Sequence, residues 1–94
     1  MDCSGVSDGA AAAIIVRAED AHRYTDRPVF LKGMAFVAGA GDGLGRDGYD
    51  FTTFPEVVSA AQQAYEQAGV TEPREQISLA EVHDCFTPTE LVLM

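Results

Sequence analysis

Between residues 28 and 82, an apolar run, a helical stretch and a second apolar run follow one another. Residues 28–38 are apolar on both faces apart from Lys32 and Gly33, which is typical of a central strand covered on both sides. Residues 77–82 are the second strand candidate. A helix between two such strands predicts parallel strands and a right-handed crossover. The expected fold class is therefore α/β, a βαβ unit of a mixed sheet with covering helices.

The predicted helix has recognisable boundaries. Thr53 is the expected N-cap, and Glu56 is placed to close a capping box. Gly69 stands where helices commonly end in the left-handed conformation. Between these ends, apolar residues recur at helical spacing on one face: Val57, Ala61, Ala64, Tyr65 and Ala68. The small alanines predict that this face approaches a sheet or another helix closely.

The residues before Pro28 predict a shorter strand and a linker. Residues 14–16 are β-branched and read as part of a buried strand, and residues 18–24 as one or two helical turns. Residues 39–48 form a glycine-rich loop that formally contains the GxGxxG pattern. A dinucleotide site needs that pattern directly between a strand and a helix, with glycines at the helix start, whereas residues 49–52 follow the pattern here. A phosphate loop needs a following Lys-Ser/Thr. Neither is present, so we expect a plain loop there.

The composition argues against several function classes. Fifteen acidic residues against six basic ones give a net charge of −9, without the Lys/Arg cluster that nucleic acid or an anionic membrane requires. Two cysteines and two histidines lack zinc-site spacing, so we expect no metal. The apolar runs are too short to span a bilayer, and the N-terminus lacks a signal-peptide pattern, so a cytoplasmic protein is the default expectation.

The strongest chemical signal is His83-Asp84-Cys85-Phe86, where the second strand runs into a helix start. Residues 87–90 supply an expected N-cap threonine, a proline at the first helical position and a glutamate at the third. A thiol near the positive end of a helix dipole is a candidate reactive group. His83 and Cys85 are therefore the predicted catalytic residues. Asp84 has a structural interpretation, and Cys3 is expected to be a buried packing residue.

These motifs resemble the thiolase superfamily. The resemblance rests on residues 3–12 (Cys-Ser-Gly-Val-Ser-Asp-Gly-Ala-Ala-Ala), the helix over 55–69 and the stretch 81–86. The branch it resembles most is the sterol-carrier-protein-type thiolases, or lipid-transfer proteins, because His-Asp-Cys-Phe stands where other thiolases carry Asn-Glu-Ala-Phe. The resemblance implies two similar α/β halves. Residues 1–27 would be the last strand of the N-terminal half plus a linker, and residues 28–94 the first βαβ of the C-terminal half.

The resemblance also implies an enzyme, an acyl-CoA C-acyltransferase that performs Claisen condensation or thiolytic cleavage in lipid or sterol side-chain metabolism. Its substrate would be a coenzyme A thioester, with no further cofactor. His83 would match the oxyanion-hole or water-positioning residue, and Cys85 the acid/base cysteine. The family's nucleophilic cysteine and Gly-His-Pro motif have no match in this sequence. We therefore expect a piece of a longer chain, cut at both ends and inactive alone.

Two other functions stay open. One is a retro-aldol lyase that acts on steroid-derived coenzyme A thioesters. The other is a non-catalytic lipid-binding or self-associating α/β module. The expected partners are an acyl-CoA, further copies of the chain (a dimer or higher homo-oligomer) and, by the resemblance, a small OB-fold protein.

Overall fold

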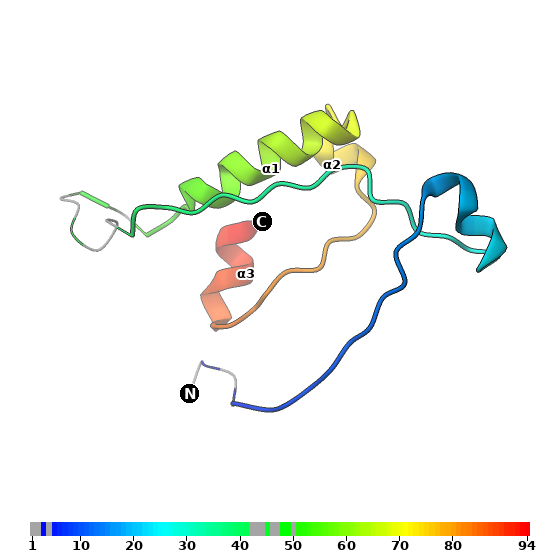
Figure 1. Ribbon diagram of the computed structural model, residues 1–94. Helices are drawn as coiled ribbons and strands as arrows, with labels where there is room; N and C mark the ends of the chain where they lie inside the picture. Colours follow the sequence, from blue (N-terminus) through cyan, green and yellow to red (C-terminus); the bar gives the residue numbers. More distant parts are fainter. Residues whose placement is uncertain (1–2, 4, 42–44, 46–47, 50) are drawn as a thin grey trace.

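The computed structural model describes residues 3, 5–41, 45, 48–49 and 51–94. Its elements, in chain order, are η1 (Ala18–Arg23, a 3₁₀ helix), α1 (Pro55–Ala68), α2 (Pro73–Gln76) and α3 (Thr87–Leu93), arranged as in Figure 1. No helix among these residues is long and apolar enough to cross a membrane. Most of the GxGxxG pattern, Gly43 to Gly48, lies outside the described residues.

The segments expected to be strands run as extended chain. Residues 28–38 follow the length of α1, and residues 77–82 lead from α2 toward α3 (Figure 1). A strand needs a neighbouring backbone to complete its hydrogen-bond ladder. Across the described ranges the one pairing is an isolated antiparallel bridge between Cys3 and Phe86. The α/β sheet and its division into 1–27 and 28–94 therefore stay predictions.

Both ends of α1 can be compared with their predicted caps. The predicted cap at Thr53 is wrong, because α1 begins at Pro55 with Phe54 as N-cap and no side-chain cap bond. Proline suits the first helical position, because its φ is already close to the helical value and it adds no unpaired N–H there. The C-terminal prediction is confirmed. Gly69 has φ 70° and ψ 26°, and its N–H donates to the carbonyl of Glu66.

Gln67 of α1 holds residues 28–38 in place. Its side-chain oxygen accepts a hydrogen bond from the N–H of Met34 (3.2 Å), and its side-chain nitrogen donates to the C=O of Met34 (3.0 Å). These two bonds satisfy the backbone N–H and C=O of Met34, as a neighbouring strand would. Beside them, Gly33 lies so close to the carbonyl of Ala64 that a Cβ at this position would overlap it. Residues 28–38 therefore pack closely against the predicted alanine face of α1.

The side chain of Glu56 has a different role from the predicted capping box. Its carboxylate fills the space beside Gly39 that a Cβ there would occupy. Gly33 and Gly39 thus mark two places where the extended segment approaches α1. Only the approach at Gly33 depends on glycine, because a Cβ there would meet backbone, whereas at Gly39 the flexible Glu56 side chain could move aside.

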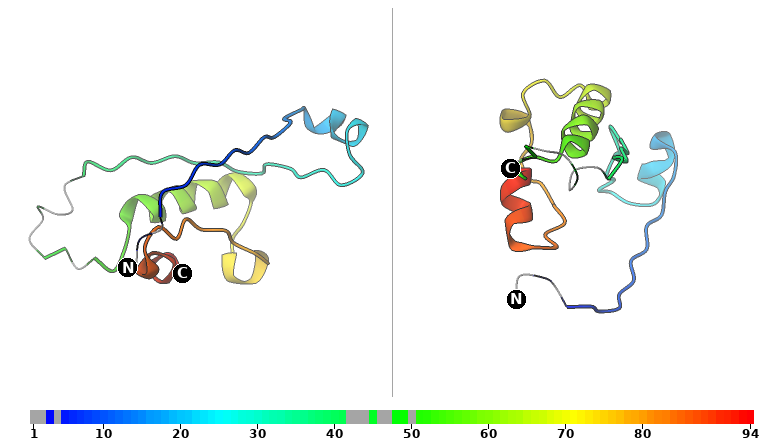
Figure 2. Two further views of the ribbon diagram at one scale, coloured as in Figure 1. Left: turned by 90° about the horizontal axis from the view of Figure 1, so that it is seen from below. Right: turned by 90° about the vertical axis from the view of Figure 1, so that its left-hand side faces the viewer.

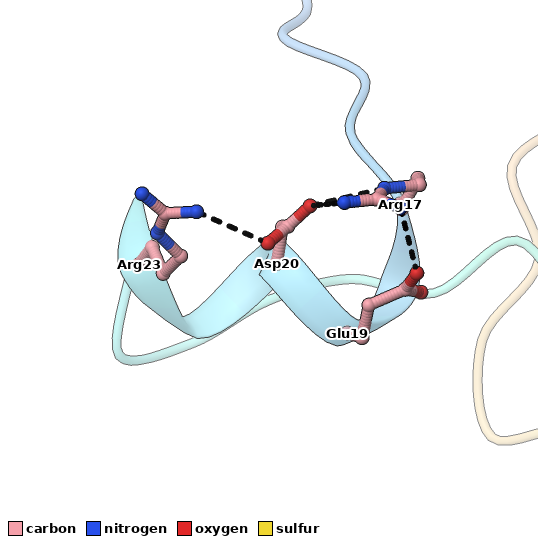
Figure 3. A network of polar contacts seen from close by, with 4 residues as sticks. All are labelled: Arg17, Glu19, Asp20 and Arg23. Carbon is pink, nitrogen blue, oxygen red and sulfur yellow. Dashed lines mark hydrogen bonds and ion pairs between the residues drawn. The ribbon is translucent and has the colours of Figure 1, made fainter.

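The linker forms η1, as predicted for residues 18–24. Asp20 accepts hydrogen bonds from Arg17 (2.8 Å) and Arg23 (3.2 Å), and Arg17 also lies 3.4 Å from Glu19 (Figure 3). Both arginines are largely exposed. Exposed pairs of this kind contribute about 0–1 kcal/mol each, so the network fixes local geometry more than global stability.

Two short helices differ from prediction. α2 forms where we expected a plain connection, because Gln76 Oε1 accepts the N–H groups of Thr71 and Glu72, both at 2.8 Å. α3 begins at Thr87 itself with Phe86 as N-cap, so the predicted capping role of Thr87 is wrong. Pro88 is the second residue of α3, one position later than predicted, and still lies in its first turn.

The chain exposes most of its apolar surface. Its accessible surface is 8836 Å², whereas a compact monomer of 10.0 kDa exposes about 5,200 Å². Its radius of gyration is 17.1 Å, against about 12 Å for a compact domain of this length. Ala21 is the one buried residue in the described part of the chain. Figure 2 shows the reason, since residues 5–17 and 28–41 extend as two arms from η1.

Candidate active site

The His-Asp-Cys-Phe stretch connects the extended residues 77–82 to α3. Cys85 is half-buried, whereas His83 and Asp84 are exposed. The difference arises because Cys85 directly precedes the N-cap of α3, where the chain turns into the helix. The Cys85 thiol is therefore partly enclosed by the chain, and the His83 imidazole is exposed to solvent.

The thiol of Cys85 has one polar neighbour that the sequence analysis did not assign. Cys85 Sγ lies 3.7 Å from Oγ1 of Thr89, in a part-buried contact where either atom can be the donor. Thr89 is four residues further on and within the first turn of α3. The four-residue spacing across a helix start was the available signal, because such residues lie close together on one side of a helical turn.

The two predicted catalytic side chains are not joined to each other. No hydrogen bond links His83 to Cys85, in the part of the chain that the structure describes. His83 and Cys85 share a connection and flank the exposed Asp84. Their convergence on one bound thioester stays a prediction.

The N-terminal motif, residues 3–12, pairs with the His-Asp-Cys-Phe stretch at one point. Cys3 and Phe86 form the isolated antiparallel bridge, so the start of residues 3–12 lies beside the end of residues 81–86. The expected burial of Cys3 is wrong, because it is exposed. Its backbone, at the end of an open arm, is what takes part in the pairing. Two of the three stretches that carry the thiolase resemblance are therefore neighbours in space.

Two apolar spaces lie beside α3. A small cavity of about 130 Å³ lies between α1 and α3, lined by Thr53, Phe54, Val57, Val58, Ala61, Val92 and Leu93. A wider groove of about 800 Å³ lies further along, between Tyr65, α2, residues 77–80 and Met94. Neither lining includes His83 or Cys85, so the connection that carries these residues lies outside both spaces.

Among the residues the structure describes, no three His, Cys, Asp or Glu side chains come together in a group that could hold a metal ion. The polar atoms that the connection offers are the Cys85 thiol, the Thr89 hydroxyl and the His83 imidazole. These groups exchange protons and hydrogen bonds, which suits acid/base work on a bound substrate.

Comparison with known proteins gives two relatives with the same name. The chain is 44% identical over 87 residues to the acetyl-CoA acetyltransferase of Methanothermobacter thermautotrophicus, covering 93% of this chain and 22% of that protein. It is 34% identical over 94 residues to the acetyl-CoA acetyltransferase of Methanocaldococcus jannaschii, covering 100% of this chain and 24% of that protein. The chain thus spans about a quarter of the length of the curated relatives it matches.

No protein-family model and no solved structure matches the chain. The two relatives do not distinguish the sterol-carrier branch from others, so that finer part of the resemblance stays a prediction. Their shared name denotes an acyltransferase, which agrees with the expected reaction class. Along its whole length the chain is therefore homologous to one segment of the acetyl-CoA acetyltransferases, and its resemblance to the thiolase superfamily is confirmed to that extent.

Proposed function

We propose that this chain forms part of a thiolase-type acyl-CoA C-acyltransferase, which joins or cleaves acyl-CoA thioesters in lipid or sterol side-chain metabolism. The observation that carries the proposal is the 44% identity over 87 residues to an acetyl-CoA acetyltransferase. The His-Asp-Cys-Phe stretch falls in the matched segment of the second relative, which covers all 94 residues. The substrate is a coenzyme A thioester, and the reaction needs no other cofactor.

Cys85 is the proposed acid/base residue. Claisen condensation requires removal of a proton from the α-carbon of one thioester, and the reverse cleavage requires its return. A general acid/base must be reachable by substrate and held in a fixed direction. The half-buried thiol meets both needs, because one side faces the connection and its sulfur lies 3.7 Å from the Thr89 hydroxyl. Thr89 is the corresponding positioning residue.

His83 is the proposed oxyanion donor. A ring N–H of an exposed imidazole is available to a thioester oxygen that approaches the connection from outside. Such a donor stabilises the negative charge that develops on the oxygen, and removing one typically lowers the rate by about 10²–10³-fold. Asp84, between the two, has no assigned chemical role.

The remaining expectations belong to this proposal and follow from the resemblance. They are a cytoplasmic location, a homo-oligomeric parent protein and a small OB-fold partner. The retro-aldol lyase and the non-catalytic module are treated as alternative outcomes of the experiment below.

The test is a chimera in which residues 1–94 replace the matching segment of the Methanothermobacter thermautotrophicus relative. We expect thiolytic cleavage of a 3-ketoacyl-CoA, followed as loss of that thioester in the presence of free coenzyme A. Cys85→Ala is expected to lower kcat by at least about 10²-fold, the lower end for a general acid/base. His83→Ala is expected to lower it by about 10²–10³-fold. The matched control is Cys3→Ala, which removes the exposed cysteine and leaves the rate unchanged.

Three results would redirect the proposal. Unchanged cleavage in Cys85→Ala would contradict the acid/base role and favour a non-catalytic module. Loss of rate in Cys3→Ala equal to that in Cys85→Ala would show a structural effect. With a 3-hydroxyacyl-CoA as substrate, cleavage to an aldehyde or ketone and a shorter acyl-CoA without consuming free coenzyme A would identify the retro-aldol lyase.

A further inference from the structure

We propose that Cys3 and Cys85 form a reversible disulfide, and that this bond stops acid/base work at Cys85. The two residues come from opposite ends of the chain. Formation of the bond rests on how the two ends meet in the structure. Its effect on activity rests on the proposed function, so the experiments below measure the bond and the activity separately.

The first observation is the distance between the two cysteine backbones. Cys3 pairs with Phe86, the residue directly after Cys85, in the isolated antiparallel bridge. Paired Cα atoms in such a bridge lie about 4.5–5.5 Å apart and consecutive Cα atoms about 3.8 Å apart, which places the Cα atoms of Cys3 and Cys85 about 6–7 Å apart. Disulfide-bonded cysteines usually have Cα atoms about 4.4–6.8 Å apart. The bridge therefore brings the two residues to the upper end of that range.

The second observation concerns the directions of the two side chains. In a regular ladder, neighbouring residues of a strand turn their side chains to opposite faces, which would separate Cys85 from Cys3. Here the pairing is a single bridge, and the chain bends at Cys85 before α3 begins at Thr87. Residues 5–15, which follow Cys3, are all exposed. The backbone movement that the disulfide needs is therefore a turn of this exposed arm about the bridge.

The third observation is that the two thiols have different surroundings. Cys3 is exposed, whereas Cys85 is half-buried with its sulfur 3.7 Å from Oγ1 of Thr89. A dissolved oxidant reaches the more exposed thiol first. The sequence contains two cysteines, so Cys85 is the thiol within the chain that can complete the bond.

The oxidant that fits this pair is a small disulfide such as glutathione disulfide. The Cys3 thiolate attacks one sulfur of the oxidant, forms a mixed disulfide and releases one glutathione. The Cys85 thiolate then attacks the Cys3 sulfur and releases the second glutathione. Two cysteines are oxidised, one glutathione disulfide is reduced, and the two thiol protons pass to the departing thiolates. The Cys85 sulfur then has no proton to give and no thiolate to accept one.

The first experiment follows the bond in the 94-residue chain, without any activity. The chain is equilibrated with reduced and oxidised glutathione and quenched with acid, and the disulfide is measured by mass spectrometry and non-reducing peptide mapping. The matched control moves the cysteine along the exposed arm, in Cys3→Ser with Val6→Cys. The Cys3–Cys85 bond should have an equilibrium constant about tenfold or more above the control, because the bridge raises the effective concentration of the pair. In guanidinium chloride the two chains should give equal values.

The second experiment uses the chimera described above in the same glutathione buffers. The initial rate of thiolytic cleavage should fall as the disulfide forms, and it should return when a dithiol reduces the bond. The Cys3→Ala chimera lacks one of the two sulfurs, so it should keep its rate in the buffer that inactivates the original. This comparison also subtracts oxidation at other cysteines of the parent protein, because both chimeras share them.

Two results would overturn the disulfide. They are a bond that forms no more readily than in the relocated control, and bonds that join separate chains in place of the two ends of one chain. Equal inactivation of the Cys3→Ala chimera would overturn the effect on activity, because the oxidation would then lie elsewhere. A fully oxidised chimera that keeps its rate would contradict the acid/base role of Cys85 and leave the disulfide standing, which separates failure of the proposed function from failure of the bond.

Discussion

At the scale of single residues, the contact between Cys85 and Thr89 gives the proposed acid/base thiol a specific environment. The separation of 3.7 Å between sulfur and oxygen is a contact with a hydroxyl, which can donate to a thiolate or accept from a thiol. A hydroxyl so placed holds the sulfur in one direction. The sequence analysis identified the cysteine and missed the threonine, because the contact exists only once α3 begins at Thr87.

This contact predicts the reactivity of the thiol. In a Cys3→Ser background, Thr89→Val keeps the shape of the side chain and removes its hydroxyl. Loss of a hydrogen bond worth about 1 kcal/mol should slow alkylation of Cys85 by iodoacetamide roughly fivefold. Thr89→Ser restores a hydroxyl and should restore the rate. Equal rates in the valine and serine variants would contradict the positioning role of Thr89.

At the scale of elements, α1 is what orders the extended chain. Gln67 and Gly33 fix the register of residues 28–38, the first by two hydrogen bonds and the second by leaving room for the carbonyl of Ala64. Without both, the segment would have no partner among the described elements. This interaction replaces, at one residue, the neighbouring strand that the sequence pattern predicts.

Gly33→Ala tests this arrangement. A methyl group at this position overlaps backbone, and such overpacking typically costs about 1–3 kcal/mol. The amide of Met34 should then exchange roughly tenfold to hundredfold faster. Gly9→Ala is the matched control, because nothing lies within 4 Å of the position of its Cβ, and Met34 should exchange there as in the original chain. An unchanged rate in Gly33→Ala would show that the segment is held by something else.

The elements that could be predicted from sequence are those decided by neighbouring residues. The end of α1 at Gly69 follows from the left-handed conformation that glycine alone adopts without strain, and η1 follows from a short polar stretch. Pairing of extended segments depends on distant parts of a chain, so periodicity identifies the segments and not their partners. The Cys3–Phe86 bridge was unpredictable for the same reason.

At the scale of the whole molecule, the chain has little interior. Ala21 alone is buried among the described residues, so apolar contacts inside one copy stabilise the fold weakly. Part of the apolar surface that a globular domain would hide lies on the two arms that leave η1, which carry Ile14, Ile15, Phe30 and Phe36 among the exposed large apolar residues (Figure 2). Stability of the isolated chain should then depend on what covers those arms.

This dependence predicts an unfolding temperature that varies with concentration. If further copies of the chain cover these arms, the Tm measured by circular dichroism should rise with protein concentration, because binding to the folded state stabilises it by mass action. Phe36→Glu should flatten the dependence. A Tm independent of concentration in the original chain would mean that association and folding are not linked.

The bond pair between Gln67 and Met34 has one more consequence. A strand with two vacant edges adds neighbours without end, which is how fibrils grow. Here a side-chain amide occupies the backbone groups of one residue in the middle of the segment, so a strand approaching this edge would have to displace Gln67 or leave a gap in its ladder at Met34. The glutamine therefore interrupts strand addition at this edge.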